Sequence, residues 1–323
     1  MKSPARPRVG LVLGGGGARG LAHVGVLRVL EAARVPVDLV VGCSMGAMVG
    51  TLFAFYGNTS DAEVRLKRFT LSSEFRRDRY DDLQTMAPIA GADSGLIQTA
   101  RRFYKLGLFF ATTLFKESFL DAAQVNRDIA AIIPEGRIED ARIPLAIVAT
   151  DLLRGEEVVL TRGPARQAVQ ASSAIAGVFP PVVLEGRQLV DGGFVDKVPV
   201  EVAFRFGADV VIAVDVSSDA SDSVDYGRTG SALSLRASAI QSDTLKNLQL
   251  RFADVVIRPD VTSVHWADFA AIESIIPMGE TAALNSLPAV RSALKRGRRK
   301  ALARFLGFDR KWSVDLRRDR VNE

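Results

Sequence analysis

The sequence is poor in residues on which several classes of protein depend. A single cysteine, Cys43, stands among 323 residues and excludes an internal disulfide. No Cys/His cluster has the spacing of a zinc site. Only two histidines are present, His23 and His265, so a mechanism with an imidazole base has just two candidates. The chain is therefore not expected to be a disulfide-stabilised or zinc-binding fold.

Long hydrophobic runs are also lacking. No apolar run reaches the roughly 18 residues that a membrane-spanning helix needs. The apolar segment near the N-terminus, Val9–Leu13, is too short for the core of a signal peptide. Hydrophobic residues make up 48% of the chain and charged residues 24%, which is ordinary for a globular protein. We expect a cytoplasmic protein without a membrane span.

The net charge of +5 is concentrated in the last part of the chain. Residues 291–323 carry twelve Lys and Arg against four Asp and Glu. We therefore divide the chain into a domain at 1–290 and a basic helical tail at 291–323. The tail is either a solvated helix or a peripheral contact with anionic lipid at the inner membrane face, since aromatic residues interrupt its charges. Nucleic acid is not expected, because no motif that reads bases accompanies the charge.

Short apolar runs alternate with segments of helical periodicity. Strands are expected at 9–13, 37–42, 143–151, 156–160, 208–216 and 254–259, with a hairpin around Glu185-Gly186. Helices are expected at 21–33, 45–56, 61–77, 121–133, 164–174, 232–250 and 279–296. Continuous apolar strands that alternate with helices predict an α/β fold with three layers, α/β/α, around a mainly parallel sheet.

A glycine-rich loop follows the first of these strands. It reads Gly14 to Gly17, then Ala18, Arg19 and Gly20. A strand, a glycine loop and a helix are typical of a phosphate-binding or dinucleotide-binding turn. Backbone N–H groups that converge on an anion equally describe an oxyanion hole.

The second glycine motif is Gly42-Cys43-Ser44-Met45-Gly46, between a buried strand and an apolar helix. A strand–turn–helix of this pattern holds a serine in an exposed, strained position, as a nucleophile requires. A dinucleotide site instead needs an acidic residue at the end of this strand. The nearest acid, Asp38, begins the strand, so a nucleotide-binding domain is disfavoured.

These motifs do not show which residue would act as the base that activates Ser44. His23 precedes the serine in a helix, and His265 lies in a polar loop, where it is most simply an ordinary loop histidine. Asp191 follows an apolar strand and precedes two glycines, and a close, desolvated carboxylate is able to act as a base. The same Asp-Gly pair is also a strong turn signal.

Taken together, the ordered blocks "GGGGARG", "GCSMG", "AVQASSAIAGVFPPV" and "DGG" resemble the patatin-like phospholipase family. The resemblance covers residues 8–285. The longer stretch around the first block, "GGGGARGLAHVGVL", is similar to bacterial members of the family and to the catalytic domains of neuropathy-target-esterase-like lysophospholipases. It implies a patatin-like fold that hydrolyses the acyl ester of a lipid, a phospholipid or lysophospholipid, through an acyl-enzyme, with no metal and no cofactor.

The resemblance also implies a role for each motif residue. Ser44 would be the nucleophile and Asp191 the base of a Ser–Asp dyad. The oxyanion would be bound by backbone N–H groups around Gly15, Gly16 and Gly17, with Arg19 close by. The remaining motif glycines are Gly20, Gly42, Gly46, Gly192 and Gly193.

Two positions depart from the family pattern. Ala176 stands where the family often has the first proline of "AIPGVFPP", which loosens one turn. Lys197 stands where the family often has asparagine, as in "DNLPV". Cys43 is interpreted as a packing residue, and Asp151 and Asp215 as residues that cap turns or bind backbone N–H groups.

Residues 103–116 form the most aromatic and apolar stretch of the chain. They are interpreted either as a helix on the core or as a contact with acyl chains or the membrane interface. Two other functions stay open. One is a catalytically quiet scaffold at a membrane surface, and the other is a carboxylesterase or thioesterase that uses the same dyad.

Overall fold

Every apolar run that we assigned to a strand is a strand in the computed structural model, which describes residues 6–72, 118, 120–217 and 230–305. Within these residues eight strands form one sheet. They are β1 (Val9–Leu13), β2 (Leu39–Cys43), β3 (Leu145–Asp151), β4 (Glu156–Leu160), β5 (Val182–Leu184), β6 (Arg187–Asp191), β7 (Val210–Val214) and β8 (Val255–Ile257).

Among the described residues are eight α-helices, of which all but α9 were predicted, most of them with shifted bounds. They are α1 (Ala22–Ala32), α2 (Met45–Tyr56), α3 (Thr59–Thr70), α7 (Ala122–Ile132), α8 (Ala165–Ser172), α9 (Val200–Arg205), α10 (Gly230–Leu250) and α11 (Ile272–Phe305). Short 3-10 turns add η1 (Gly17–Leu21), η2 (Ile138–Asp140), η3 (Gly192–Phe194) and η4 (Phe269–Ala271).

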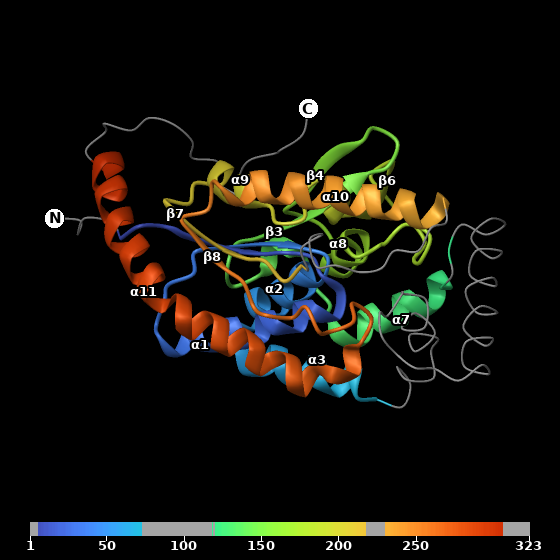
Figure 1. Cartoon of the computed structure of the whole chain (residues 1–323), viewed down its shortest axis with the longest axis horizontal. Helices are drawn as coiled ribbons and strands as arrows, with labels where there is room; N and C mark the ends of the chain where they lie inside the picture. The colour runs from blue at the N-terminus through green and yellow to red at the C-terminus, as the bar shows by residue number, and fades with distance from the viewer. Residues whose placement is uncertain (1–5, 73–117, 119, 218–229, 306–323) are drawn as a thin grey trace.

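The prediction of a helix at 279–296 was wrong in its bounds. α11 is longer at both ends and contains Pro277 and Pro288. Proline removes a backbone hydrogen bond from a helix interior, but packing can outweigh this loss. Ile272, Ile275 and Ile276 of α11 are buried in the same core as α1, and α11 bends along its length (Figure 1). The boundary that we placed at residue 290 falls inside this helix.

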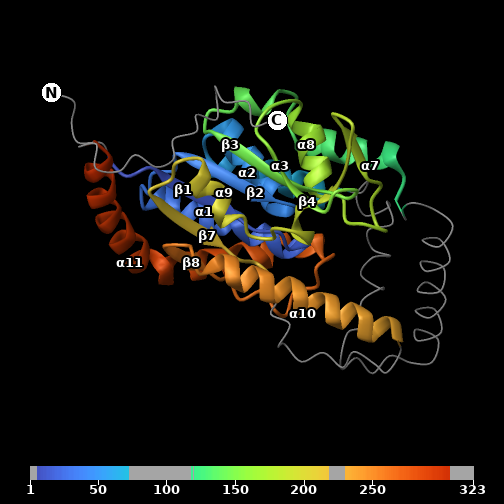
Figure 2. The same cartoon turned by 90° about the horizontal axis from the view of Figure 1, so that it is seen from above.

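The sheet is mainly parallel and is covered on both faces. β3, β2, β1, β7 and β8 are parallel neighbours in that order, and β4, β5 and β6 add antiparallel pairs. One core lies between the sheet and α1, α2, α3, α7, α8 and α11, and a second lies between the sheet and α9. α1, α3 and α11 lie on the opposite side of the sheet from α9 and α10 (Figures 1 and 2). The predicted three-layer α/β/α fold is therefore confirmed.

The register on β3 determines what meets at the carboxyl end of β2. β4 pairs with the edge of β3 from Ile147 to Asp151. β2 pairs with β3 as far as Val148, and β6 pairs with β3 from Ala149 onward. Because β4 overlaps both ranges along β3, β2 and β6 must lie on the edge of β3 opposite β4. β2 and β6 therefore end against each other along one strand, with Cys43 opposite Val148 and Asp191 opposite Ala149.

None of the described helices is long and apolar enough to cross a membrane. We predicted lipid contact for 103–116 and for the basic tail 291–323. The segment 103–116 and residues 306–323 of the tail lie outside the residues that the structure describes.

Candidate active site

Ser44 forms the turn between β2 and α2. Its backbone has φ 54° and ψ −122°, a conformation that L-residues rarely adopt. The turn is tight because α2 begins against β1: a Cβ atom at Gly46 would lie 2.0 Å from the carbonyl oxygen of Leu13. A strained residue of this kind costs about 1–3 kcal/mol and is retained where the surrounding packing enforces it. The geometry is that of a nucleophile elbow, with the positive end of the α2 dipole at the serine.

Asp191 lies at the end of β6 and contacts Ser44 directly. The Ser44 hydroxyl donates to Asp191 Oδ2 at 2.6 Å, a length typical of a hydrogen bond to a carboxylate. The Gly193 N–H donates to the other carboxylate oxygen at 2.7 Å. The Asp191 backbone is held on both sides, because its N–H donates to Ala174 at 2.9 Å and its carbonyl accepts from the Thr150 hydroxyl at 2.8 Å. The carboxylate is thus fixed toward the serine.

The environment of Asp191 makes its carboxylate more basic than usual. Burial raises the pKa of Asp191 to about 6, and it outweighs the opposing hydrogen bonds from Ser44 and Gly193 and the positive charge of Lys197. A carboxyl group with this pKa is ionised at neutral pH and accepts a proton more readily than an exposed aspartate.

Ser172 is a functional candidate that the sequence analysis did not single out. Its hydroxyl is fully buried at the end of α8, accepts from the Ser44 backbone N–H at 2.9 Å and donates to the Val148 carbonyl at 2.6 Å. This side chain therefore ties the strained turn to β3. The stretch "AVQASSAIAGVFPPV" contains it, but only the folded contacts distinguish Ser172 from its neighbour Ser173.

The glycine loop lies beside this pair and is anchored at several points. Gly14 N–H donates to Val214 at 3.0 Å, Gly15 N–H to Lys197 at 3.0 Å and Ala18 N–H to Trp266 at 2.6 Å, each to a carbonyl oxygen. Gly15 therefore has its N–H engaged within the protein. The N–H groups of Gly16 and Gly17 have no acceptor among the residues that the structure describes.

Gly17 is the residue that turns this loop into η1. Its φ is +58°, and a Cβ atom there would lie 2.3 Å from the Trp266 carbonyl oxygen, so both conformation and space require glycine. Arg19, two residues later, donates from Nε to the Val264 carbonyl at 2.7 Å and so fastens the loop to the segment before Trp266.

The other motif glycines lie where elements of the site pack together. Gly20 of η1 faces Met45 of α2, and Gly42 faces Ala47 across the serine turn. Gly192 faces the Val148 carbonyl and the Cys43 thiol, and Gly193 supplies its N–H to Asp191.

Neither histidine contacts the pair. His23 is buried and donates from Nε2 to the Gly14 carbonyl at 2.8 Å, and burial lowers its pKa to about 4. The neutral ring therefore supports the glycine loop. His265 Nδ1 accepts from the Ala267 N–H at 3.2 Å, and neither ring hydrogen bonds to Ser44 or Asp191.

Cys43, Asp151 and Asp215 have structural contacts that agree with their predicted roles. Cys43 is completely buried, and burial raises the pKa of its thiol well above the usual range. Asp151 accepts from the N–H groups of Leu153 and Arg154. Asp215 accepts from the Ser217 N–H at 3.0 Å. No group of His, Cys, Asp and Glu within the described part of the chain is arranged to hold a metal ion.

Ser44 lies where two hollows of different character meet. The first, called the apolar cavity below, is lined by side chains that include Met48, Leu66, Phe69, Ile129, Phe179 and Phe269. The second, called the polar groove, is lined by residues that include Gly16, Gly17, Arg19, Asp191, Lys197, Ser217 and Ser242. Gly17, Ser44, Ile175 and Trp266 line both. A molecule with an apolar part and a polar part would therefore place the junction between them at the serine.

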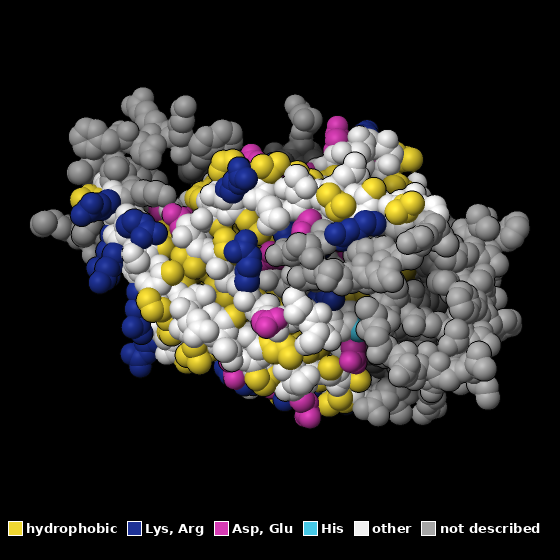
Figure 3. Space-filling model, viewed as in Figure 1, with side chains coloured by type: hydrophobic (Ala, Val, Ile, Leu, Met, Phe, Trp, Pro, Cys, Tyr) yellow, Lys and Arg dark blue, Asp and Glu magenta, His cyan; other side chains and the backbone are white. Residues whose placement is uncertain are grey.

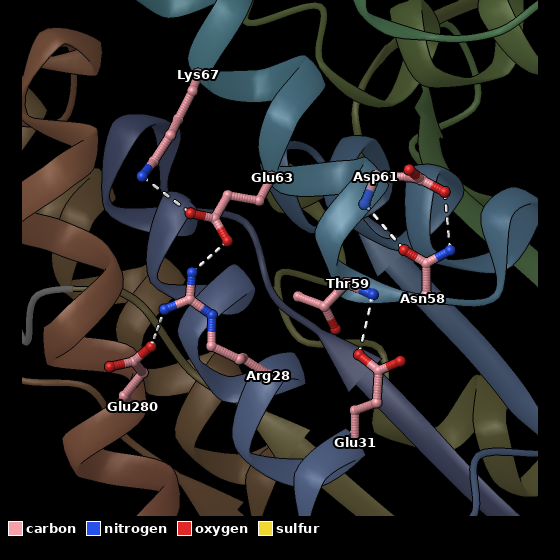
Figure 4. Close-up of polar contacts among 8 residues, drawn as sticks. All are labelled: Arg28, Glu31, Asn58, Thr59, Asp61, Glu63, Lys67 and Glu280. Atoms are coloured by element: carbon pink, nitrogen blue, oxygen red, sulfur yellow. Dashed lines mark hydrogen bonds and ion pairs between the residues drawn. The ribbon is translucent and has the colours of Figure 1, made fainter.

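A polar network joins α1, α3 and α11 on the side of the sheet where the apolar cavity lies, and of these helices only α3 lines the cavity (Figure 4). Arg28 of α1 forms ion pairs with Glu63 of α3 and Glu280 of α11. Lys67 adds a second pair to Glu63 at 2.9 Å, and Glu31 accepts from the Thr59 N–H at 3.0 Å. Burial alone would raise the pKa of Glu63, but the hydrogen bonds from Arg28 and Lys67 outweigh it and lower this pKa.

Comparison with known proteins gives a consistent result. Residues 11–204 match the family model described as "Patatin-like phospholipase". The chain is 36% identical over 223 residues to Lysophospholipase NTE1 of Mycosarcoma maydis, which covers 68% of this chain and 10% of that protein. It is 30% identical over 297 residues to Patatin-like phospholipase domain-containing protein 7 of Rattus norvegicus, which covers 84% of this chain and 20% of that protein.

The chain thus spans between a tenth and a fifth of the length of these two relatives. Among solved structures, VipD from Legionella pneumophila aligns with 90% of this chain and 68% of its own, at 14% identity and a TM-score of 0.41.

Proposed function

The chain belongs to the patatin-like phospholipase family, and we propose that it is a serine acyl-hydrolase that cleaves the acyl ester of a phospholipid or lysophospholipid. The observation that carries the proposal is the 2.6 Å hydrogen bond from the hydroxyl of Ser44, in its strained turn, to Asp191. The names of the relatives point the same way, since they include a lysophospholipase and a patatin-like phospholipase domain.

In the proposed first step, Asp191 accepts the hydroxyl proton as Ser44 Oγ attacks the ester carbonyl. The carbonyl oxygen becomes an oxyanion, which the N–H groups of Gly16 and Gly17 bind because they have no acceptor among the described residues. Collapse of this intermediate breaks the bond to the alcohol, which leaves with the proton from Asp191. An acyl group then remains on Ser44.

The second step repeats the chemistry with water. Asp191 takes a proton from the water as its oxygen attacks the acyl-enzyme carbonyl, and the same loop binds the second oxyanion. The bond to Ser44 Oγ breaks, Oγ recovers the proton from Asp191, and the fatty acid leaves. Gly15 acts by holding the loop to Lys197, and Arg19 by holding it to Val264.

The two hollows support a lipid as the substrate. An acyl chain fits the apolar cavity because removal of its methylene groups from water is favourable by about 0.8 kcal/mol each. The leaving alcohol would then occupy the polar groove. An esterase for short-chain esters would not need an apolar cavity beside the serine.

We further propose that the protein takes its substrate from a membrane surface, as a peripheral protein on the inner face. α10 carries a row of half-exposed or exposed apolar side chains, and hydrophobic side chains are visible along this helix (Figure 3). They are Leu233, Ile240, Leu245 and Leu248. Leu245 also lines the polar groove, so this face is continuous with the entrance to Ser44.

The positive charge on the C-terminal half of α11 also supports contact with a membrane surface. Its exposed basic residues gather at one end of the molecule (Figure 3). They are Arg291, Lys295, Arg296, Arg298 and Arg299. Each basic residue near an anionic surface contributes about 1 kcal/mol of attraction.

Fluorophosphonate labelling followed by a panel of lipid esters tests the proposed reaction. The unaltered chain should be labelled at Ser44, and Ser44→Ala should lose the label and about 10⁴–10⁶-fold of turnover. Ser274→Ala, a matched change at an exposed serine of α11, should keep both. A folded chain without Ser44-dependent labelling would instead support the catalytically quiet scaffold.

A further inference from the structure

Lys197 lies between η3 and α9, close to the pair on which the proposed function rests. Its carbonyl accepts the Gly15 N–H at 3.0 Å, and its side chain lines the polar groove together with Ser44 and Asp191. Its positive charge acts on Asp191 and Cys43, where it partly offsets the rise in pKa that burial causes. The ammonium group is therefore a part of the groove at the reacting end.

The Lys197 charge has no ion-pair partner among the residues that the structure describes. The two acids that face it are already engaged by Lys246, which lies 2.7 Å from Asp243 and 3.3 Å from Asp215. Arg258 adds a further contact to Asp215 at 3.6 Å.

Lys197 is only partly buried, but the loss of part of its hydration in the groove still has a cost. Burial lowers the pKa of Lys197, and the neighbouring charge of Lys246 lowers it further. Buried charges in proteins are normally paired, because desolvation is otherwise uncompensated. Lys246, by contrast, is fully buried and has two ion-pair partners, so among the described residues Lys197 is the lysine of the groove whose charge is available to an anionic group bound there.

The position of Lys197 defines the partner by its chemistry. With the acyl chain in the apolar cavity, the leaving alcohol extends into the polar groove, where the Ser242 hydroxyl and the Gln241 amide are also present. In a glycerophospholipid, an anionic phosphate follows the scissile ester at the distance of a glycerol backbone. A neutral acylglycerol has only a hydroxyl there.

We propose that Lys197 binds the phosphate of the substrate head group, and that this contact makes the enzyme prefer acyl esters of glycerophosphate to neutral acylglycerols. The inference rests on the proposed function and names its substrate class. Lys197 is on this view a specificity-determining residue, since it acts on the leaving group and takes no part in the transfer of the proton.

The test compares two substrates with the same acyl chain, 1-palmitoyl lysophosphatidylcholine and 1-palmitoylglycerol, in neutral detergent micelles. Lys197→Asn should lower kcat/KM for the phosphate-bearing ester about 10- to 100-fold, mainly through KM, as expected for loss of a charged contact. For the neutral ester, kcat/KM should change less than about threefold. Lys197→Arg should retain the preference, and Lys67→Asn, a change of the same kind at the surface of α3, should have no effect on it.

The assay is run at pH 8 because Lys197 lowers the pKa of Asp191, so its removal raises that pKa. At pH 8 the base is ionised in either variant, and an altered preference then reports the head group alone.

A second measurement separates binding from chemistry. Hydrolysis of p-nitrophenyl butyrate is followed in the presence of 1-O-hexadecyl-glycero-3-phosphocholine, an ether lipid without an ester. Its inhibition constant should rise in Lys197→Asn, and that of 1-O-hexadecylglycerol should not. Inorganic phosphate should not compete, and if it inhibits as strongly as the ether lipid, the site binds free phosphate and the inference is overturned.

Two further outcomes are distinguishable. An equal loss on both lipid esters would overturn the inference and leave the hydrolase in place, since Lys197 would then act on the dyad or the loop. Absence of hydrolysis of every ester by the unaltered chain, with no label on Ser44, would overturn the proposed function and this inference with it.

Discussion

Replacement of Asp191 with asparagine should remove activity and stabilise the folded chain at alkaline pH. Burial raises the pKa of this carboxyl from its ordinary 3.8 to about 6. The folded protein therefore holds the Asp191 proton more tightly than the unfolded chain does. The contribution of Asp191 to the free energy of unfolding is near zero below pH 3.8, becomes unfavourable as the pH rises toward 6, and stays at its full unfavourable value above that.

The size of this effect follows from the two pKa values. A pKa difference of about 2 corresponds to a penalty of about 3 kcal/mol at pH 8, and only about 1 kcal/mol is present at pH 4.5. Asparagine does not titrate, and it keeps the local contacts, because its oxygen accepts from Gly193 and its amide donates to Ser44. Effects of the substitution that do not depend on pH cancel in the comparison. The change in the free energy of unfolding that Asp191→Asn causes should therefore be about 2 kcal/mol more stabilising at pH 8 than at pH 4.5.

Urea denaturation of both proteins at the two pH values measures this difference directly. In parallel, kcat/KM of the unaltered chain for p-nitrophenyl butyrate should rise with pH through about 6, as the base loses its proton. The variant should lose at least about 10³-fold of that activity. If the substitution changes stability equally at both pH values, Asp191 ionises like an exposed carboxyl, and its assignment as a desolvated base fails.

Three further results are expected. Ser172→Ala leaves the N–H of Ser44 without its buried acceptor, so unfolding should become about 1–3 kcal/mol easier and turnover should fall, as chemical denaturation and ester assays would measure. Arg28→Ala should cost about 1 kcal/mol at neutral pH, because its ion pairs are partly exposed, and the loss should shrink in acid as the carboxylates protonate. Ile240→Ser with Leu248→Ser on α10 should weaken binding to anionic vesicles about tenfold without lowering Tm or the hydrolysis of p-nitrophenyl butyrate, and unchanged vesicle binding would remove α10 from the proposed membrane contact.

Much of the fold follows from local patterns in the sequence. Continuous apolar runs such as Val9–Leu13 are buried on both faces, and a parallel sheet between two helical layers provides that environment. The turn at Glu185-Gly186 is equally local, because both residues have positive φ. The strand–turn–helix around Ser44 was predicted for the same reason, since the flanking elements and the small residues are adjacent in the chain.

The features that position the site depend on contacts between distant segments. The meeting of β2 and β6 on one edge of β3 is a matter of register, which no strand specifies alone. Ser172 differs from Ser173 only in the direction of its side chain on α8. The bond from Gly15 to the carbonyl of Lys197 joins positions far apart in sequence, so the motif alone did not reveal that this N–H is occupied.

In the proposed mechanism, these long-range contacts bring the serine and the aspartate together as nucleophile and base. An aspartate in water is a weak base, and a serine in an ordinary turn is not exposed toward a substrate. Here the surrounding packing holds both residues in unfavourable states, since Ser44 has a positive φ and the Asp191 carboxyl is buried beside it. The hydrogen bonds from Ser44 and Gly193 limit the rise in pKa to about 6, so the carboxylate stays ionised at neutral pH while it gains basicity. In the proposed mechanism, the same packing that lowers stability at this point makes Asp191 more able to accept the serine proton.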